Sequence, residues 1–161
     1  MIKFLPVLLF VFSFMPAAHA ERGTLEGWGD IKFGMTFDEA YRASGGIGKK
    51  GADLFTGTVL YWKTSIIGEP ANVRVVFGRK DRVTAIELEF PGQGGVASLG
   101  ECRAIMLPKF DEIVLALSMK YGEPDAETKA QFTFKNSAYI ITMIKSLNRS
   151  CSITVNYISN L

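Results

Sequence analysis

Residues 108–122 read PKFDEIVLALSMKYG and carry the clearest helical pattern in the chain. Pro108 suits the first turn of a helix, where its missing N–H costs little, and Gly122 suits the position just past the end. The large apolar residues between them recur three or four positions apart, which is the spacing of one helix face. This face consists of Phe110, Ile113, Val114, Leu117 and Tyr121. The pattern predicts a helix that buries one side in a core.

Three segments with alternating apolar residues follow this helix and predict strands at about 131–134, 139–145 and 151–158. The first half of the chain has the same order of elements. Thr36 and Glu39 form a capping-box pattern, which predicts a short helix that ends at the Gly45–Gly46 pair. Strands are then expected at about 55–66, 73–77 and 83–90.

The two halves also share the letters FDE, at 37–39 near the first helix start and at 110–112 in the second helix. The common order of elements and this match together predict an internal duplication. The expected fold class is therefore α+β, with two αβββ repeats. Residues 21–90 would form the first αβββ unit, the glycine-rich stretch 91–101 a linker, and residues 102–161 the second αβββ unit.

Composition limits the classes of function. The chain has 161 residues, of which 48% are apolar and 21% charged, and its formal net charge is +2. It is too short for a (β/α)₈ barrel or a two-domain dinucleotide enzyme, and the balanced charge argues against a nucleic-acid partner. The apolar content is high enough to bury a core, which excludes a disordered chain.

The first twenty residues have the layout of a secretory signal peptide. Lys3 precedes an almost entirely apolar run, and the segment ends in the small-residue pattern Ala18-His19-Ala20. We expect cleavage after Ala20 and release into the periplasm or the medium. The apolar run is too short to span a bilayer, which argues against a membrane anchor. No membrane insertion is expected after removal of the leader. Loss of His19 leaves no histidine, so neither a Ser-His-Asp triad nor an imidazole metal site can form, and no metal or cofactor is predicted.

Cys102 and Cys151 are the only cysteines. Two cysteines in an exported chain are expected to form a disulfide. Their spacing is far from the C-x-x-C arrangement of redox-active pairs. We predict a structural disulfide that ties the last strand to the second helix segment.

Two motifs resemble those of small bacterial envelope proteins of the outer-membrane assembly lipoprotein and β-lactamase-inhibitor-protein-like group. The segment Ile31–Ala40, IKFGMTFDEA, is similar to the G-M-T/S-x-x-E helix entry of that group. Tyr121-Gly122-Glu123-Pro124 is similar to the Y/L-G-x-P sequence that commonly ends a helix there. The resemblance implies helices packed on one face of an antiparallel sheet and a binding function without catalysis. The chain lacks the lipidated cysteine of the assembly lipoproteins, so a lipid anchor is not expected.

Strand alternation places tyrosine, apolar and charged side chains on the sheet face that points away from the helices. A face that met only solvent would be more polar. This face is therefore expected to be covered by the other repeat, by a second copy in a homodimer, or by a target protein. The predicted binding residues are Tyr61, Lys63, Arg74, Glu87, Tyr139 and Met143. We predict that they bind an unidentified envelope protein and that the module is not an enzyme.

Two other functions remain open. Glu87 and Glu89 share one strand face at a backbone separation of about 6.6 Å, and a carboxylate-dependent hydrolase acting on envelope polysaccharide would use them as acid and base. Cross-strand pairing with Lys63 and Arg74 accounts for the same residues. A structural homo-oligomer is the third function.

The glycine pattern GIGKKG at 46–51 predicts a solvated loop. It leaves a helix and enters a strand, which is the reverse of the order in a dinucleotide-binding site.

Overall fold

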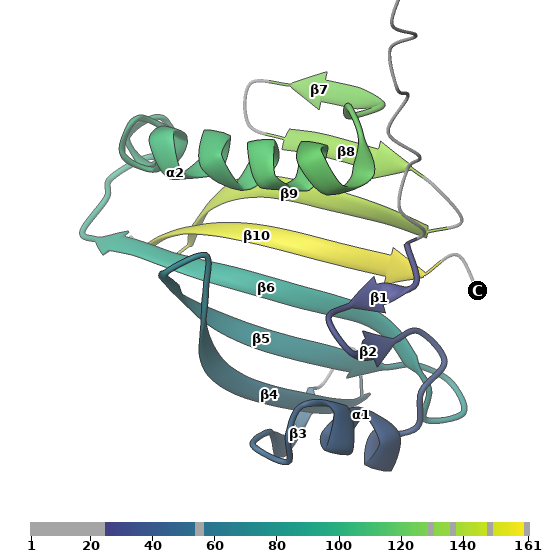
Figure 1. Ribbon diagram of the computed structural model, residues 1–161. Helices are drawn as coiled ribbons and strands as arrows, with labels where there is room; N and C mark the ends of the chain where they lie inside the picture. Colours follow the sequence, from purple (N-terminus) through teal and green to yellow (C-terminus); the bar gives the residue numbers. More distant parts are fainter. Residues whose placement is uncertain (1–24, 54–56, 129–130, 136–137, 148–149, 160–161) are drawn as a thin grey trace, which may run out of the picture.

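The computed structural model describes residues 25–53, 57–128, 131–135, 138–147 and 150–159. They contain two helices, α1 (Phe37–Ala43) and α2 (Leu99–Tyr121), and two sheets (Figure 1). The small sheet pairs β1 (Gly27–Trp28) with β2 (Ile31–Lys32). The large sheet consists of β3 (Lys49–Asp53), β4 (Gly57–Ile66), β5 (Glu69–Phe77), β6 (Val83–Gly94), β7 (Ala126–Thr128), β8 (Gln131–Lys135), β9 (Ala138–Leu147) and β10 (Ser150–Ser159).

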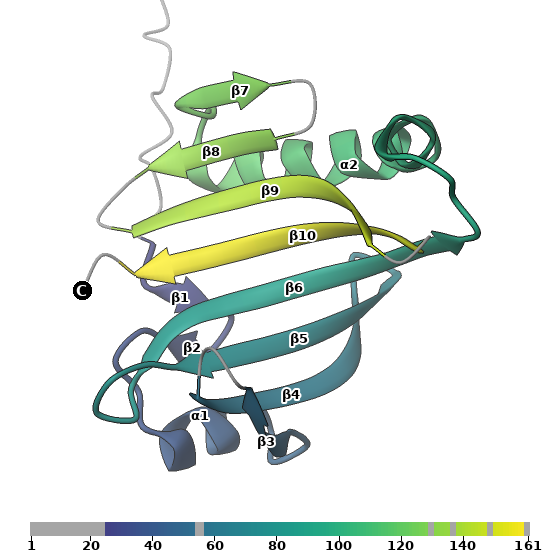
Figure 2. The ribbon, with the colours of Figure 1, turned by 180° about the vertical axis from the view of Figure 1, so that it is seen from behind.

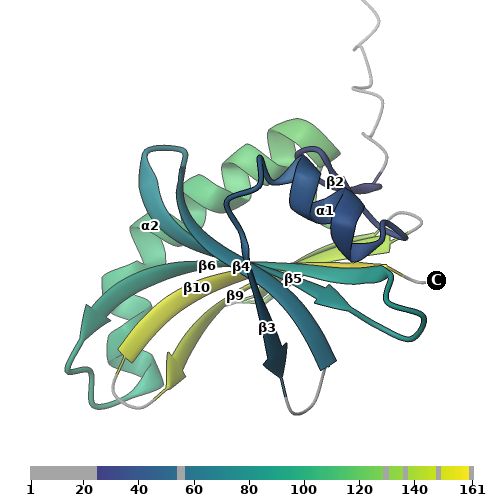
Figure 3. The same ribbon diagram turned by 90° about the horizontal axis from the view of Figure 1, so that it is seen from below.

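The strands of the large sheet lie in the order β3-β4-β5-β6-β10-β9-β8-β7, and every neighbouring pair is antiparallel. β6 and β10 pair in the middle and join the two halves of the chain into one sheet. Both helices and the β1–β2 hairpin lie on the same side of this sheet (Figure 3). α2 packs mainly against β9 and β10. The domain is therefore α+β, with one layer of helices on one layer of sheet.

The expected two αβββ repeats are wrong. The described chain is mostly β, four strands follow each helix, all eight belong to one sheet, and the two helices have 7 and 23 residues. The missed strands β3 and β7 form the two edges of the sheet. An edge strand is held by backbone pairing to a single neighbour and needs no apolar alternation, so the sequence KKGAD of β3 has no strand pattern.

The expected linker at 91–101 belongs largely to β6 and α2. α2 begins at Leu99, where the Ser98 hydroxyl accepts a hydrogen bond from the N–H of Glu101 at 3.1 Å. Pro108 lies inside the helix, and α2 changes direction along its length, as an interior proline causes (Figures 1 and 2). A Cβ on Gly92 would lie 2.3 Å from the sulfur of Met106, so this glycine allows α2 to approach the end of β6.

The predicted apolar face of the helix is confirmed, because all five of its residues are buried. They pack on the inward-facing side chains of the sheet, and the rings of Phe110 and Phe132 lie 5.4 Å apart. The predicted disulfide is also confirmed. It joins Cys102 of α2 to Cys151 of β10, with the two Cα atoms 5.5 Å apart. The helix layer is thus bonded covalently to a central strand.

The capping box of α1 is present as predicted. The N–H of Thr36 donates to Oε2 of Glu39 at 2.8 Å, and the N–H of Glu39 donates to the Thr36 hydroxyl at 3.4 Å. The predicted signal peptide, residues 1–20, lies outside the described residues. Within the described ranges, neither helix combines the length and the apolar composition needed to cross a membrane.

Candidate functional site

The sheet has one face under the helices and one open face. Figure 2 views the open face, and neither of the two described helices crosses it. Alternation along the strands separates the side chains as predicted: Trp62 and Leu88 are buried toward the helices, while Tyr61 and Glu87 point to the other side. We define the outer face as the surface formed by these outward side chains of β4, β5, β6, β10 and β9.

Cross-strand register arranges the outer face in rows. In the first row Tyr61 lies opposite Arg74, Arg74 opposite Glu87, and Glu87 opposite Asn156. Directly opposite residues have Cβ atoms about 5 Å apart, so each side chain can contact the next. The register therefore places an aromatic residue, a cation and an anion side by side on three adjacent strands.

The second row runs parallel to the first, two residues along each strand. Lys63 lies opposite Asn72, Asn72 opposite Glu89, and Glu89 opposite Thr154. Met143 of β9 lies opposite Thr154 and is the last residue of this row on the outer face. Lys63 thus faces an amide rather than a glutamate, which differs from the cross-strand pairing expected from the sequence.

A shallow hollow of about 270 Å³ lies between the two rows. It brings together four of the six predicted binding residues, namely Tyr61, Lys63, Arg74 and Glu87. This volume is close to the lower limit of small-molecule pockets, which measure roughly 300 to 1,000 Å³. A single side chain of a protein partner would also fit into the hollow.

Polar contacts hold the side chains around the hollow. The Arg74 guanidinium lies 2.7 Å from the Asp53 carboxylate, and the pair spans the intervening strand β4. Nδ2 of Asn72 donates to Oε2 of Glu89 at 3.1 Å. Both side chains of the ion pair are about one third exposed, so the pair adds at most about 1 kcal/mol to stability. Its main effect is to orient Arg74.

Asp53 is a member of this surface that the sequence did not reveal. It is the last residue of β3, a segment that sequence patterns assigned to no strand, and its partner Arg74 is 21 positions further along the chain. Only the pairing of β3 with β4 and of β4 with β5 brings the two residues together. No local pattern carries that information.

The other two predicted binding residues lie on β9, at the far side of β10. Met143 is partly buried and lies two strands from Glu89, which is about 10 Å. The backbone of Tyr139 lies in β9 opposite Ile158, and its side chain is outside the described residues. The six predicted residues therefore form no single pocket, and the backbone positions place them along one continuous face.

The outer face combines charged side chains with large aromatic and apolar ones. Tyr61 is 46% exposed, which is high for a large aromatic residue, and Ile141 of β9 is only partly covered. Thr154, at the centre of the face, is 1% exposed because its row neighbours cover it. The face thus combines a filled centre with an aromatic side chain at its margin, and exposed aromatic residues beside charges are typical of binding surfaces.

The two glutamates are placed for pairing rather than for hydrolysis. Glu87 faces Arg74 across the strands, and Glu89 accepts a hydrogen bond from Asn72. Both rise from β6 and line the same hollow of about 270 Å³, whereas a glycosidase holds the scissile bond between two carboxyl groups. Among the described residues, no three side chains of His, Cys, Asp or Glu come together as metal ligands.

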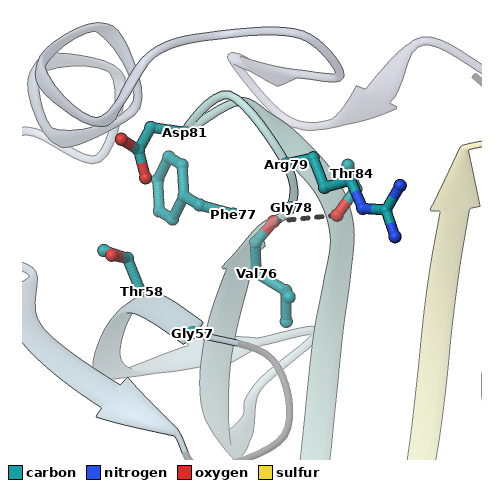
Figure 4. Close-up of a pocket in the computed structure, with 8 residues that line it drawn as sticks. All are labelled: Gly57, Thr58, Val76, Phe77, Gly78, Arg79, Asp81 and Thr84. Atoms are coloured by element: carbon teal, nitrogen blue, oxygen red, sulfur yellow. Dashed lines mark hydrogen bonds between the residues drawn. The ribbon is translucent and has the colours of Figure 1, made fainter.

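A larger hollow of about 560 Å³ lies at the β5–β6 turn (Figure 4). Its charged residues are Arg79 and Asp81, which point in different directions in Figure 4. The Thr84 hydroxyl is already bonded to the carbonyl oxygen of Val76 at 3.4 Å. Because its polar groups do not converge, this hollow offers no arrangement for catalysis or ligand recognition.

Residues 46–48 of the glycine pattern connect α1 to β3, but residues 49–51 belong to β3, so the expected loop is wrong for the second half of the pattern. The pattern leaves a helix and enters a strand, as the sequence indicated, and so it lacks the helix N-terminus of a phosphate site.

Comparison with protein-family models, with curated proteins and with solved structures finds no match. The functional argument therefore depends on the fold and on the surfaces described above.

Proposed function

We propose that the protein is an exported, non-catalytic binding module whose outer face docks on a protein of the bacterial envelope. The observation that carries this proposal is the open face of an eight-stranded sheet with the half-exposed Tyr61 beside an ordered Arg74–Asp53 pair. Aromatic and arginine side chains are enriched among residues that dominate binding energy. The buried disulfide and the signal-like leader support an oxidising compartment.

The dimensions of the outer face suit a protein partner. The five strands of the outer face have four spacings of about 4.8 Å, so the face is about 19 Å wide, and ten residues along a strand cover about 33 Å. The product, about 630 Å², is most of the roughly 800 Å² that each partner contributes to a standard protein interface. A small ligand would use only a fraction of this area.

The test is affinity capture from an envelope extract, followed by titration of the captured protein. Tyr61→Ala should weaken its binding by about thirtyfold, the effect of truncating an aromatic anchor residue. The thermal midpoint should stay nearly unchanged, because Tyr61 is about half exposed. Tyr139→Ala, the second predicted anchor, should act in the same way.

Tyr41→Ala is the matched control, since Tyr41 is 39% exposed but lies on α1, on the opposite side of the sheet. It should bind the captured protein like the wild type. Equal losses for Tyr61→Ala and Tyr41→Ala would refute the assignment of the outer face, and so would early unfolding of Tyr61→Ala.

Two other outcomes would favour the alternative functions. A mass that rises with concentration in light scattering and returns to that of the monomer in Tyr61→Ala would favour the homo-oligomer. Hydrolysis of cell-wall polysaccharide that disappears in the Glu87→Gln, Glu89→Gln double variant would favour the hydrolase.

A further inference from the structure

A second surface feature lies on the helix side of the sheet, opposite the outer face. It is a cleft of about 310 Å³ between α2, the β1–β2 turn and the β4–β5 turn, which we call the apolar cleft. Its floor consists of Leu88 and Phe90 from β6 and Val155 and Tyr157 from β10, all buried core residues. An open cleft thus reaches down to the central strands of the sheet.

The walls of the apolar cleft are apolar as well. α2 contributes Ile113, Ala116 and Leu117, and β1 contributes Trp28. Burial, and then the neighbouring Tyr121, raise the pKa of Tyr157, so its hydroxyl stays neutral and the floor carries no charge. A ligand that enters the cleft must therefore have an apolar body.

The β4–β5 turn is fastened to α2 by an ion pair between Glu69 and Lys109. Figure 3 shows this turn rising from the sheet on the same side as α2. The ion pair thus links the wall that this turn forms to α2. A cleft whose walls are linked in this way pays less conformational entropy on binding than a cleft that must first close.

Ile67, at the tip of this turn, carries two energetic costs. It has a φ of 49°, a left-handed conformation that β-branched residues avoid, and it is followed by Gly68 with a φ of 81°. Two-residue turns of this kind favour Asn-Gly. Ile67 is also 57% exposed and lies on the rim of the apolar cleft. Burial of Ile67 against a bound apolar ligand would compensate for these costs.

We propose that the apolar cleft binds a single acyl chain with an anionic head group. The chain would lie on the floor formed by β6 and β10 with Ile67 closing over it, and the head group would meet the exposed ammonium of Lys120 at the mouth. A volume of 310 Å³ equals about ten water-sized volumes, so about ten chain atoms fit. A peptide backbone would leave polar groups unpaired on this floor.

The probe is decanoate, and the readout is tryptophan fluorescence. The chain has two tryptophans, Trp28 in the cleft wall and Trp62 beside it, with ring centroids 6.4 Å apart. Decanoate should change the fluorescence saturably. Affinity should rise by up to about fourfold for each added methylene and level off beyond about ten carbons.

Two matched pairs of variants on α2 locate the site. Ala116→Phe fills the cleft and should abolish the fluorescence change, whereas Ala104→Phe, also exposed but outside the cleft, should bind like the wild type. Lys120→Gln should weaken decanoate binding about threefold without affecting decanol, and Arg103→Gln should change neither.

Ile67→Asn separates a binding role from a structural one. Asparagine adopts a positive φ more readily than isoleucine, so the thermal midpoint should rise. Decanoate binding should nevertheless weaken about fivefold through loss of the apolar rim. Equal decanoate binding by Ala116→Phe and Ala104→Phe would overturn the proposal, as would an absence of any saturable fluorescence change in the wild type.

A last arm distinguishes the two sources of such a chain. If the occupant is a membrane lipid, the protein should sediment with phosphatidylcholine vesicles that contain phosphatidylglycerol, and Ala116→Phe should not. If it is a free fatty acid, decanoate should bind while neither protein sediments. Both results support the apolar cleft, whereas sedimentation that is equal for wild type and Ala116→Phe would show that vesicles bind elsewhere and would count against a lipid occupant.

Discussion

Removing the disulfide tests how the helix layer is held on the sheet. The perturbation is the double variant Cys102→Ala, Cys151→Ala. Both cysteines are buried, at 0% and 2% exposure, and they join α2 to a central strand across a sequence separation of 49. Alanine keeps the helix and strand positions apolar, so the main loss is the covalent link.

The magnitude follows from the length of the closed loop. For a separation of 49, the chain-entropy relation gives a loss of about 4 kcal/mol at 25 °C. A domain of about 140 residues has an unfolding entropy of about 0.3 kcal/mol per degree near its midpoint. The expected fall in thermal midpoint is therefore about 13 °C. The loss of about 4 kcal/mol is a large share of the 5–15 kcal/mol that usually stabilises a domain.

The assay is urea unfolding followed by far-UV circular dichroism on the oxidised protein, the double variant and the reduced wild type. The double variant and the reduced wild type should lose similar stability. Both should show a larger m-value than the oxidised protein, because the uncrosslinked denatured chain exposes more surface. A loss below about 1 kcal/mol in both would refute the reasoning, since the link would then contribute little beyond the packing of α2.

Two further predictions concern the N-terminal part of the chain. Hydrogen bonds from the backbone N–H and then the hydroxyl of Thr36, with the charge of Arg82, hold the pKa of Glu39 below its usual 4.5. The ionised Glu39 carboxylate should therefore stabilise the fold at pH values above 4.5, and this stabilisation should disappear as the pH falls through the lowered pKa. NMR titration should show a partial return toward 4.5 in Thr36→Ala, and no return would contradict the capping geometry. Gly27→Ala would place a Cβ 2.0 Å from the carbonyl oxygen of Ile31 at a φ of +151° and should cost about 1–3 kcal/mol in urea unfolding. Gly29→Ala, where no atom lies within 4 Å, should cost less.

Much of the fold could be predicted where a local pattern determines the structure. Thr36 with Glu39 marked the start of α1, Gly122 marked the end of α2, and the spacing of large apolar residues identified the buried face of α2. Strand alternation also placed Tyr61 and Glu87 correctly on the sheet face away from the helices. In each case the relevant interaction partner lies within a few positions in the sequence, or burial alone sets the pattern.

The remainder depended on partners that are distant in the sequence. Pro108 fits the first turn of a helix, yet α2 starts at Leu99 because Ser98 supplies a cap and the bent helix accommodates the proline. β3 has no alternation of its own and is defined only by pairing with β4. The Asp53–Arg74 contact could not be predicted either, because Asp53 belongs to β3. The apolar cleft could not be predicted because it forms only where three separate elements meet.

The pairing of β6 with β10 determines both proposed surfaces at once. Leu88 lies opposite Val155 and both form the floor of the apolar cleft, while the next residues along, Glu87 and Asn156, face each other on the outer face. A slip of one residue would exchange these sides, because successive side chains of a strand point to opposite faces. The disulfide at Cys151 fixes one end of β10 to α2 and so opposes such a slip. Single substitutions on either surface should therefore act on one binding activity alone, whereas a change of register would remove both.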